Sequence, residues 1–130
     1  MLQVYIADDS MVVREKLREA FEERGSVEVV GTSGDAKQAI EEIRRLNPQV
    51  VIIDIRIPGG GGLFILKDVK SRPPERTTII LTSFPYPQYR TSYLAAGADY
   101  FFDKNKNIPT LTNILFDLAS PNRGSHVEYP

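Results

Sequence analysis

Three acidic residues and one lysine stand where their side chains could do chemistry together. Asp54 directly follows a run of four apolar residues. Asp8 and Asp9 end an earlier, mostly apolar run in the same way, and Lys104 comes shortly after a late aromatic run. Because the carboxyl ends of parallel strands meet at one edge of a sheet, we expect these four side chains to converge there.

A cluster of this composition predicts metal-assisted phosphoryl chemistry. Neighbouring carboxylates cannot all stay ionised without a compensating cation, and an oxygen-only set without His or Cys suits Mg²⁺. Lys104 adds an ammonium group, and Thr82, at the end of another apolar run, adds a hydroxyl donor. Together with Mg²⁺ they would bind three equatorial phosphoryl oxygens. The residues therefore predict phosphoryl transfer onto a carboxylate.

Short apolar segments that alternate with segments of helical period must position these side chains. The predicted strands are residues 2–7, 27–31, 50–54, 77–82 and 99–102. Helices are expected between them and after the last, with boundaries marked by Gly25, Pro48, Pro73, Pro87 and Pro109. The third strand is apolar at almost every position, which indicates a central strand covered on both faces. This alternation predicts an α/β fold, a single doubly wound (βα)5 domain.

Length and composition agree with one globular domain. The 130 residues are 42% hydrophobic and 25% charged, and there is no cysteine, which excludes disulfides and thiolate chemistry. The domain is expected over residues 1–119. Residues 120–130 lack any period and contain several breakers, so they are expected to form a flexible C-terminal tail, with no second domain after it.

Charge and hydropathy also limit the partners. The net charge of −1 comes from 16 basic and 17 acidic residues spread along the chain, so direct nucleic-acid binding by this chain is not expected. No apolar run approaches the ~20 residues of a membrane span, and no secretory leader is recognisable. The expected location is cytoplasmic.

Four motifs in the same order resemble the receiver domain of bacterial two-component response regulators, over roughly residues 1–119. They are Asp8-Asp9, Asp54 followed by Pro58 and Gly62, Thr82-Ser83, and the run Gly97-Ala98-Asp99-Tyr100-Phe101-Phe102-Asp103-Lys104. Each motif alone is weak, but their order at successive strand ends is specific. The resemblance implies a flavodoxin-like parallel five-stranded sheet of order 2-1-3-4-5.

The resemblance also implies a phosphoacceptor and a metal site. Asp54 would accept the phosphoryl group. Asp9 and Asp54 would ligate Mg²⁺ together with the backbone carbonyl of Arg56, and Asp8 would hold the ion through water.

Further roles implied by the resemblance concern the response to phosphate. Lys104 would pair with Asp54 and then with the phosphoryl group, and Thr82 would donate to a phosphoryl oxygen. Phe101 would be the switch aromatic, partly exposed or of mixed rotamer before phosphorylation and buried after it. Asn105 stands where the family commonly has a cis proline, which predicts a trans bond in this loop, because a cis bond to a non-proline costs roughly 2.5–4 kcal/mol.

The preferred interpretation is a stand-alone, non-enzymatic phosphoacceptor that assists its own phosphorylation and dephosphorylation. It would receive phosphate from a sensor histidine kinase or a phosphotransfer protein. The surface made by the fourth helix, the fifth strand and the fifth helix would then change, for a downstream protein target or for self-dimerisation.

Four alternatives remain. The chain could be the N-terminal receiver of a longer, for example DNA-binding, regulator, or a pseudo-receiver that binds partners without phosphorylation. An aspartyl-phosphate enzyme acting on small molecules usually has a second acid two residues after the nucleophile, where this chain has Arg56. Asp9 or Ser10, finally, could simply cap the first helix.

Overall fold

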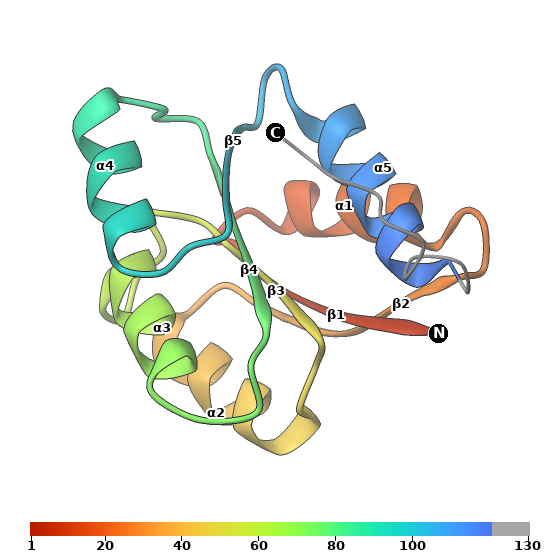
Figure 1. Ribbon diagram of the computed structural model, residues 1–130, viewed down its shortest axis with the longest axis horizontal. Coiled ribbons are helices and arrows are strands. Elements are labelled where there is room, and N and C mark those ends of the chain that lie inside the picture. The colour runs from red at the N-terminus through yellow and green to blue at the C-terminus, as the bar shows by residue number, and fades with distance from the viewer. Residues whose placement is uncertain (121–130) are drawn as a thin grey trace.

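The predicted strands form one parallel sheet in the computed structural model, which describes residues 1–120 (Figure 1). The strands are β1 (Leu2–Ala7), β2 (Val27–Ser33), β3 (Val50–Ile53), β4 (Thr77–Thr82) and β5 (Tyr100–Asp103). Their order in the sheet is β2-β1-β3-β4-β5, and every neighbouring pair is parallel. The predicted fold class and strand order are therefore confirmed. The expected tail falls almost entirely on residues 121–130, outside the described residues.

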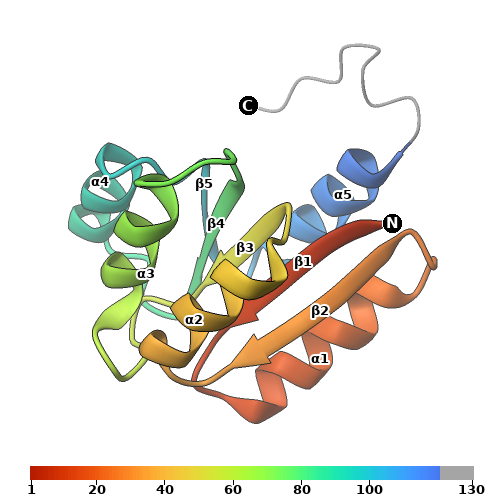
Figure 2. The same ribbon diagram turned by 90° about the horizontal axis from the view of Figure 1, so that it is seen from below.

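Helices cover both faces of this sheet (Figure 2). They are α1 (Met11–Glu22), α2 (Ala36–Leu46), α3 (Gly61–Lys70), α4 (Pro87–Ala95) and α5 (Ile108–Ala119). Leu17 of α1 and Leu115 of α5 belong to one apolar cluster, whereas α2, α3 and α4 pack into a second cluster on the other face. Alternate residues of β3 pack into the two clusters. Val51 and Ile53 belong to the cluster with α2, α3 and α4, and Val50 and Ile52 to the cluster with α1 and α5.

The strand ends differ from the predicted ones by one or two residues. β2 continues to Ser33, because Ala7 pairs with Ser33 and Asp8 donates its backbone N–H to the Ser33 carbonyl. β5 ends at Asp103, opposite Thr82 of β4. β3 ends at Ile53, so Asp54 is the first residue beyond the strand. Such shifts depend on pairing between strands, which local sequence does not encode.

Side chains at the helix starts explain where the first two helices begin. The Ser10 hydroxyl accepts a hydrogen bond from the Val13 N–H at 3.2 Å and caps α1, and Asp35 caps α2 in the same way. Of the two candidates for the N-cap of α1, Ser10 is the cap, so the Asp9 carboxylate is not used for capping. Among the residues that the structure describes, no helix is long and apolar enough to cross a membrane.

Candidate functional site

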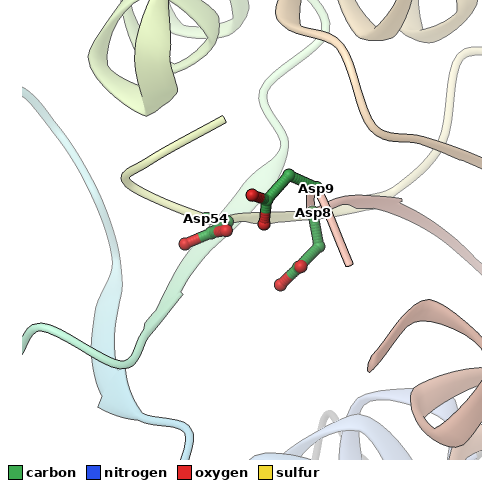
Figure 3. Close-up of side chains that lie close together, drawn as sticks. All are labelled: Asp8, Asp9 and Asp54. Carbon is green, nitrogen blue, oxygen red and sulfur yellow. The ribbon is translucent and has the colours of Figure 1, made fainter. Parts of the chain in front are cut away.

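The ends of β1 and β3 bring three carboxylates together. These two strands are neighbours in the sheet, and the Asp54 N–H donates to the Ala7 carbonyl at 2.9 Å. Asp8 and Asp9 follow Ala7, so all three acids lie at the carboxyl edge, where strand order reverses. One oxygen from each carboxylate lies within 4.8 Å of the others (Figure 3). The predicted convergence of the acids is confirmed.

Burial and charge crowding disfavour ionisation of Asp54. Asp54 is 4% exposed and Asp8 is 2% exposed, whereas Asp9 faces solvent. Burial raises the pKa of Asp54 from 3.8 to about 6; the Asp8 charge adds to this effect, Lys104 opposes it, and Asp9 raises the pKa further. Additional positive charge beside Asp54 would therefore stabilise its ionised form.

Lys104 supplies one positive charge to the cluster. Its Nζ lies 2.6 Å from Asp8 Oδ2 and 3.5 Å from Asp54 Oδ2. The backbone N–H of Lys104 donates to the Thr82 carbonyl at 2.9 Å, which fixes the lysine at the end of β4. The expected pairing with Asp54 is present, and the shorter contact is with Asp8. The bond between Lys104 and Asn105 is trans, as predicted.

Two residues hold Asp8 in place that the sequence did not single out for this role. The Ser10 N–H donates to Asp8 Oδ1 at 2.9 Å, and an Arg14 guanidinium nitrogen donates to the Asp8 carbonyl oxygen at 2.7 Å. The only sequence signal for Arg14 is its position one turn into the first helix, on the side that faces the strand end. These bonds orient Asp8 toward Lys104.

Thr82 is fully buried at the end of β4, with 0% exposure. Its Oγ1 accepts a hydrogen bond from the Phe84 N–H at 2.9 Å, which leaves the hydroxyl hydrogen as a donor. Thr82 lies opposite Asp103, the residue before Lys104, and its role toward a phosphoryl group stays a prediction.

Phe101 occupies a buried position on β5, opposite Ile80 of β4. The ring is 7% exposed, its centroid is 6.4 Å from that of Tyr93, and Arg90 lies above it with Cζ 6.0 Å from the centroid. An Arg90 guanidinium nitrogen also donates to the Phe101 carbonyl oxygen at 3.3 Å. The ring is buried in this conformation rather than partly exposed, because Tyr93 and Arg90 cover it. The expected mixture of rotamers stays a prediction.

Arg56 and Phe84 contact each other beside the site. The Arg56 Cζ lies 3.7 Å from the centre of the Phe84 ring, within cation–π distance. Each residue stands two positions after a strand-end residue of the site, Asp54 or Thr82. That shared offset was the signal available in the sequence, but the contact itself depends on β3 and β4 being neighbours.

The loop between Asp54 and α3 packs closely against the Asp54 backbone. A Cβ atom on Gly62 would lie 2.5 Å from the Asp54 carbonyl oxygen, so a larger residue there would displace the acceptor's backbone. Gly59, Gly60 and Gly61 have positive φ angles, which side-chain-bearing residues adopt at a cost. The glycine run thus provides the backbone conformation of the turn that leads from Asp54 to α3.

Residues 4–116 match the family described as the response regulator receiver domain. The chain belongs to this family. The DNA-binding transcriptional activator DevR/DosR of Mycobacterium tuberculosis is 30% identical over 120 residues, which cover 92% of this chain and 55% of that protein. The transcriptional regulatory protein LnrK of Bacillus subtilis is 28% identical over 92% of this chain and 54% of its own length.

Solved structures agree with this assignment. A LuxR-family DNA-binding response regulator from Staphylococcus aureus superposes with a TM-score of 0.84 and 25% identity, over 92% of this chain and 100% of that one. The signal receiver domain of the NarL regulator of Mycobacterium tuberculosis gives 0.83 and 28%, over 91% and 95%. This receiver chain spans about half the length of these two curated relatives.

The acidic cluster of this receiver fits a Mg²⁺ ion. Its donors are carboxylate oxygens from two adjacent loops, two of the three acids are buried, and one ammonium group faces them. Mg²⁺ prefers oxygen ligands and is bound by one or two carboxylates plus waters and phosphate oxygens. The excess negative charge around Asp54 is what such an ion would neutralise.

Proposed function

We propose that this receiver accepts a phosphoryl group on Asp54, in the cytoplasm, from a sensor histidine kinase or a phosphotransfer protein. One observation carries the proposal: Asp54 is buried at the end of the central strand, with two other acids and Lys104 around its carboxylate. Membership of the receiver family supports the same role. The chemistry is displacement at phosphorus, in which an Asp54 oxygen forms the new P–O bond and the P–N bond to the donor histidine breaks.

Asp9, Asp54 and the backbone carbonyl of Arg56 would hold Mg²⁺, with Asp8 acting through water. The bound ion would supply positive charge that offsets the charge on the transferred phosphoryl oxygens. Asp8 would also position Lys104. Its ion pair with Lys104 would keep the ammonium group beside Asp54 before phosphorylation. The chain thus assists its own phosphorylation and dephosphorylation without acting on a separate substrate.

Lys104 and Thr82 would bind the phosphoryl oxygens after transfer. The lysine ammonium already lies 3.5 Å from Asp54, and the Thr82 hydroxyl has a hydrogen left to donate. A new group of about −1.5 to −2 charges would draw both side chains toward it. Movement of Thr82 would change the packing on β5, where Phe101 is the switch residue that Arg90 and Tyr93 hold in place.

The surface of α4, β5 and α5 would carry the signal to a downstream protein or to a second copy of this chain. Direct contact with nucleic acid is not proposed for the receiver itself. DevR/DosR is a DNA-binding activator and shares the receiver over 55% of its length, so we keep, as the second candidate, the N-terminal receiver of a longer regulator.

Intact-mass spectrometry after incubation with acetyl phosphate and Mg²⁺ tests the phosphoacceptor. The wild-type chain should gain one phosphoryl mass, and Asp54→Asn should gain none. Asp117→Asn is the matched control, because it makes the same chemical change on α5, outside the acidic cluster. Gain of the mass by Asp54→Asn at the wild-type rate refutes the assignment. A wild-type chain that gains none, yet keeps its fold, points to the pseudo-receiver.

A further inference from the structure

A second charged cavity lies at the amino-terminal edge of the sheet, opposite the edge that carries Asp54. Its volume is about 610 Å³, within the roughly 300–1,000 Å³ typical of small-molecule sites. The first residues of three strands line it, namely Leu2, Val50 and Thr77, together with the loop between α3 and β4. The cavity is therefore separate from the acidic site by the length of the strands.

Cations dominate this end of the molecule. Lys70, Arg72 and Arg76 line the cavity, against Glu75 and Asp99. Further cations occupy the last turns of the neighbouring helices, Arg44 and Arg45 in α2 and Lys67 in α3. The net charge of the chain is only −1, but the charges are separated in space. The acids of the proposed phosphorylation site lie at one end of the strands and these cations at the other.

Arg76 is a buried cation that forms no direct ion pair with a carboxylate in the described residues. It is 6% exposed, and its guanidinium donates to neutral acceptors: the Pro48 carbonyl at 3.0 Å, the Pro74 carbonyl and the Asn47 side chain. Within residues 1–120, no carboxylate lies at ion-pair distance from Arg76. Burial lowers the pKa of Arg76 and the charge of Arg72 lowers it further, while the charge of Asp68 opposes these two effects. A buried unpaired charge is costly.

The two cations nearest Arg76 also keep unused capacity. Lys70 Nζ pairs with Asp99 Oδ2 at 3.1 Å and donates to the Arg76 carbonyl at 3.2 Å, which leaves one of its three N–H groups without a protein partner in the described residues. The same Asp99 oxygen also accepts the Thr78 N–H at 2.8 Å. Arg72 forms an ion pair with Asp68, while its buried Nε has no hydrogen-bond partner in the described part of the chain. The available acids are thus shared among other donors, and the cavity wall keeps positive charge.

We propose that this cavity binds a small oxyanion, a phosphate- or carboxylate-bearing metabolite, through Lys70 and Arg72 with the Arg76 charge behind them. Such a ligand would supply the negative charge that Arg76 lacks and acceptors for Lys70 and Arg72. The inference does not depend on phosphorylation of Asp54. Without Mg²⁺ the acidic cluster at the other edge would repel an anion. Anion binding measured without Mg²⁺ would therefore report on the cavity and not on the acidic cluster.

Amide NMR titration without Mg²⁺ tests the proposal on the full chain. Inorganic phosphate, pyrophosphate and citrate are added separately at constant ionic strength, with sodium chloride as the reference. Saturable shifts are expected at residues 47–50, 70–77 and 99, with none at Asp8, Asp9 or Asp54. The relative affinities of the phosphate compounds and of citrate distinguish a phosphate-bearing from a carboxylate-bearing ligand, and saturation by either supports the site.

Substitutions distinguish specific binding in the cavity from nonspecific electrostatic attraction of anions to this end of the molecule. Lys70→Gln and Arg72→Gln should each weaken binding about tenfold or more, since each removes a charged hydrogen-bond donor. Arg45→Gln removes the same charge at the same end of the molecule but does not line the cavity, and it should bind as the wild type does. Equal weakening by all three variants, shifts reproduced by sodium chloride, or no saturation up to ~10 mM anion overturns the proposal. None of these tests needs Arg76 itself replaced, which would remove its bonds to the loops.

Discussion

Replacing Asp54 with asparagine should stabilise the protein at neutral pH. The pKa of Asp54 is raised from 3.8 to about 6, mainly by burial and by the charge of Asp8. Between these two values the native carboxyl keeps a proton that the unfolded chain has lost, so its contribution to stability falls as pH rises through this window. A shift of this size corresponds to about 3 kcal/mol at pH 7, which asparagine avoids because it never ionises. The Lys104 ammonium keeps its Asp8 partner in the variant.

Urea unfolding of the wild type and Asp54→Asn, in EDTA and across pH values of about 4 to 8, measures this effect. The variant should be more stable by about 3 kcal/mol at neutral pH, and the difference should shrink toward zero as the pH falls below ~4. Asp117→Asn on α5, outside the site, is the control; its difference from wild type should stay below about 1 kcal/mol. Comparing difference curves cancels the titration of groups that do not interact with Asp54.

Mg²⁺ provides a second arm of the same experiment. An ion that binds only the native acidic cluster at ten times its Kd should raise wild-type stability by about 1.4 kcal/mol and leave Asp54→Asn nearly unchanged. Wild type and variant of equal stability at pH 7, or a difference that does not vary with pH, would refute the argument that burial and charge crowding disfavour the Asp54 carboxylate.

Three further substitutions test the surroundings of the site. Gly62→Ala places a Cβ 2.5 Å from the Asp54 carbonyl oxygen, so it should cost about 1–3 kcal/mol in urea unfolding and slow the gain of phosphoryl mass; wild-type values for both would contradict this fit. Ser10→Ala removes the cap that accepts from the Val13 N–H and should cost about 1 kcal/mol, whereas Ser10→Asp should be close to wild type. Lys104→Met removes the cation 3.5 Å from Asp54, so carboxyl NMR titration should show the Asp54 pKa rising above its present value of about 6; an unchanged midpoint would show that the lysine does not stabilise the carboxylate.

The sequence by itself determined the elements and the chemical class of the site. Apolar runs and helical periods mark each strand and helix, because local burial patterns follow the period of the element. The position of Asp54 after a fully apolar run, with acids after the first strand and a lysine after the last, was enough to predict a carboxylate cluster and Mg²⁺-assisted phosphoryl transfer. The receiver motifs then gave the strand order, which periodicity alone does not specify.

Only the tertiary structure decided which atoms meet. The shorter contact of Lys104 with Asp8, the contact of Arg56 with Phe84 and the burial of Phe101 under Arg90 all join separate strands and loops. The buried charge of Arg76, which has no direct ion pair in residues 1–120, likewise depends on how two distant loops pack. Distances and burial are properties of neighbours that the fold assembles, and the chain order of residues does not contain them.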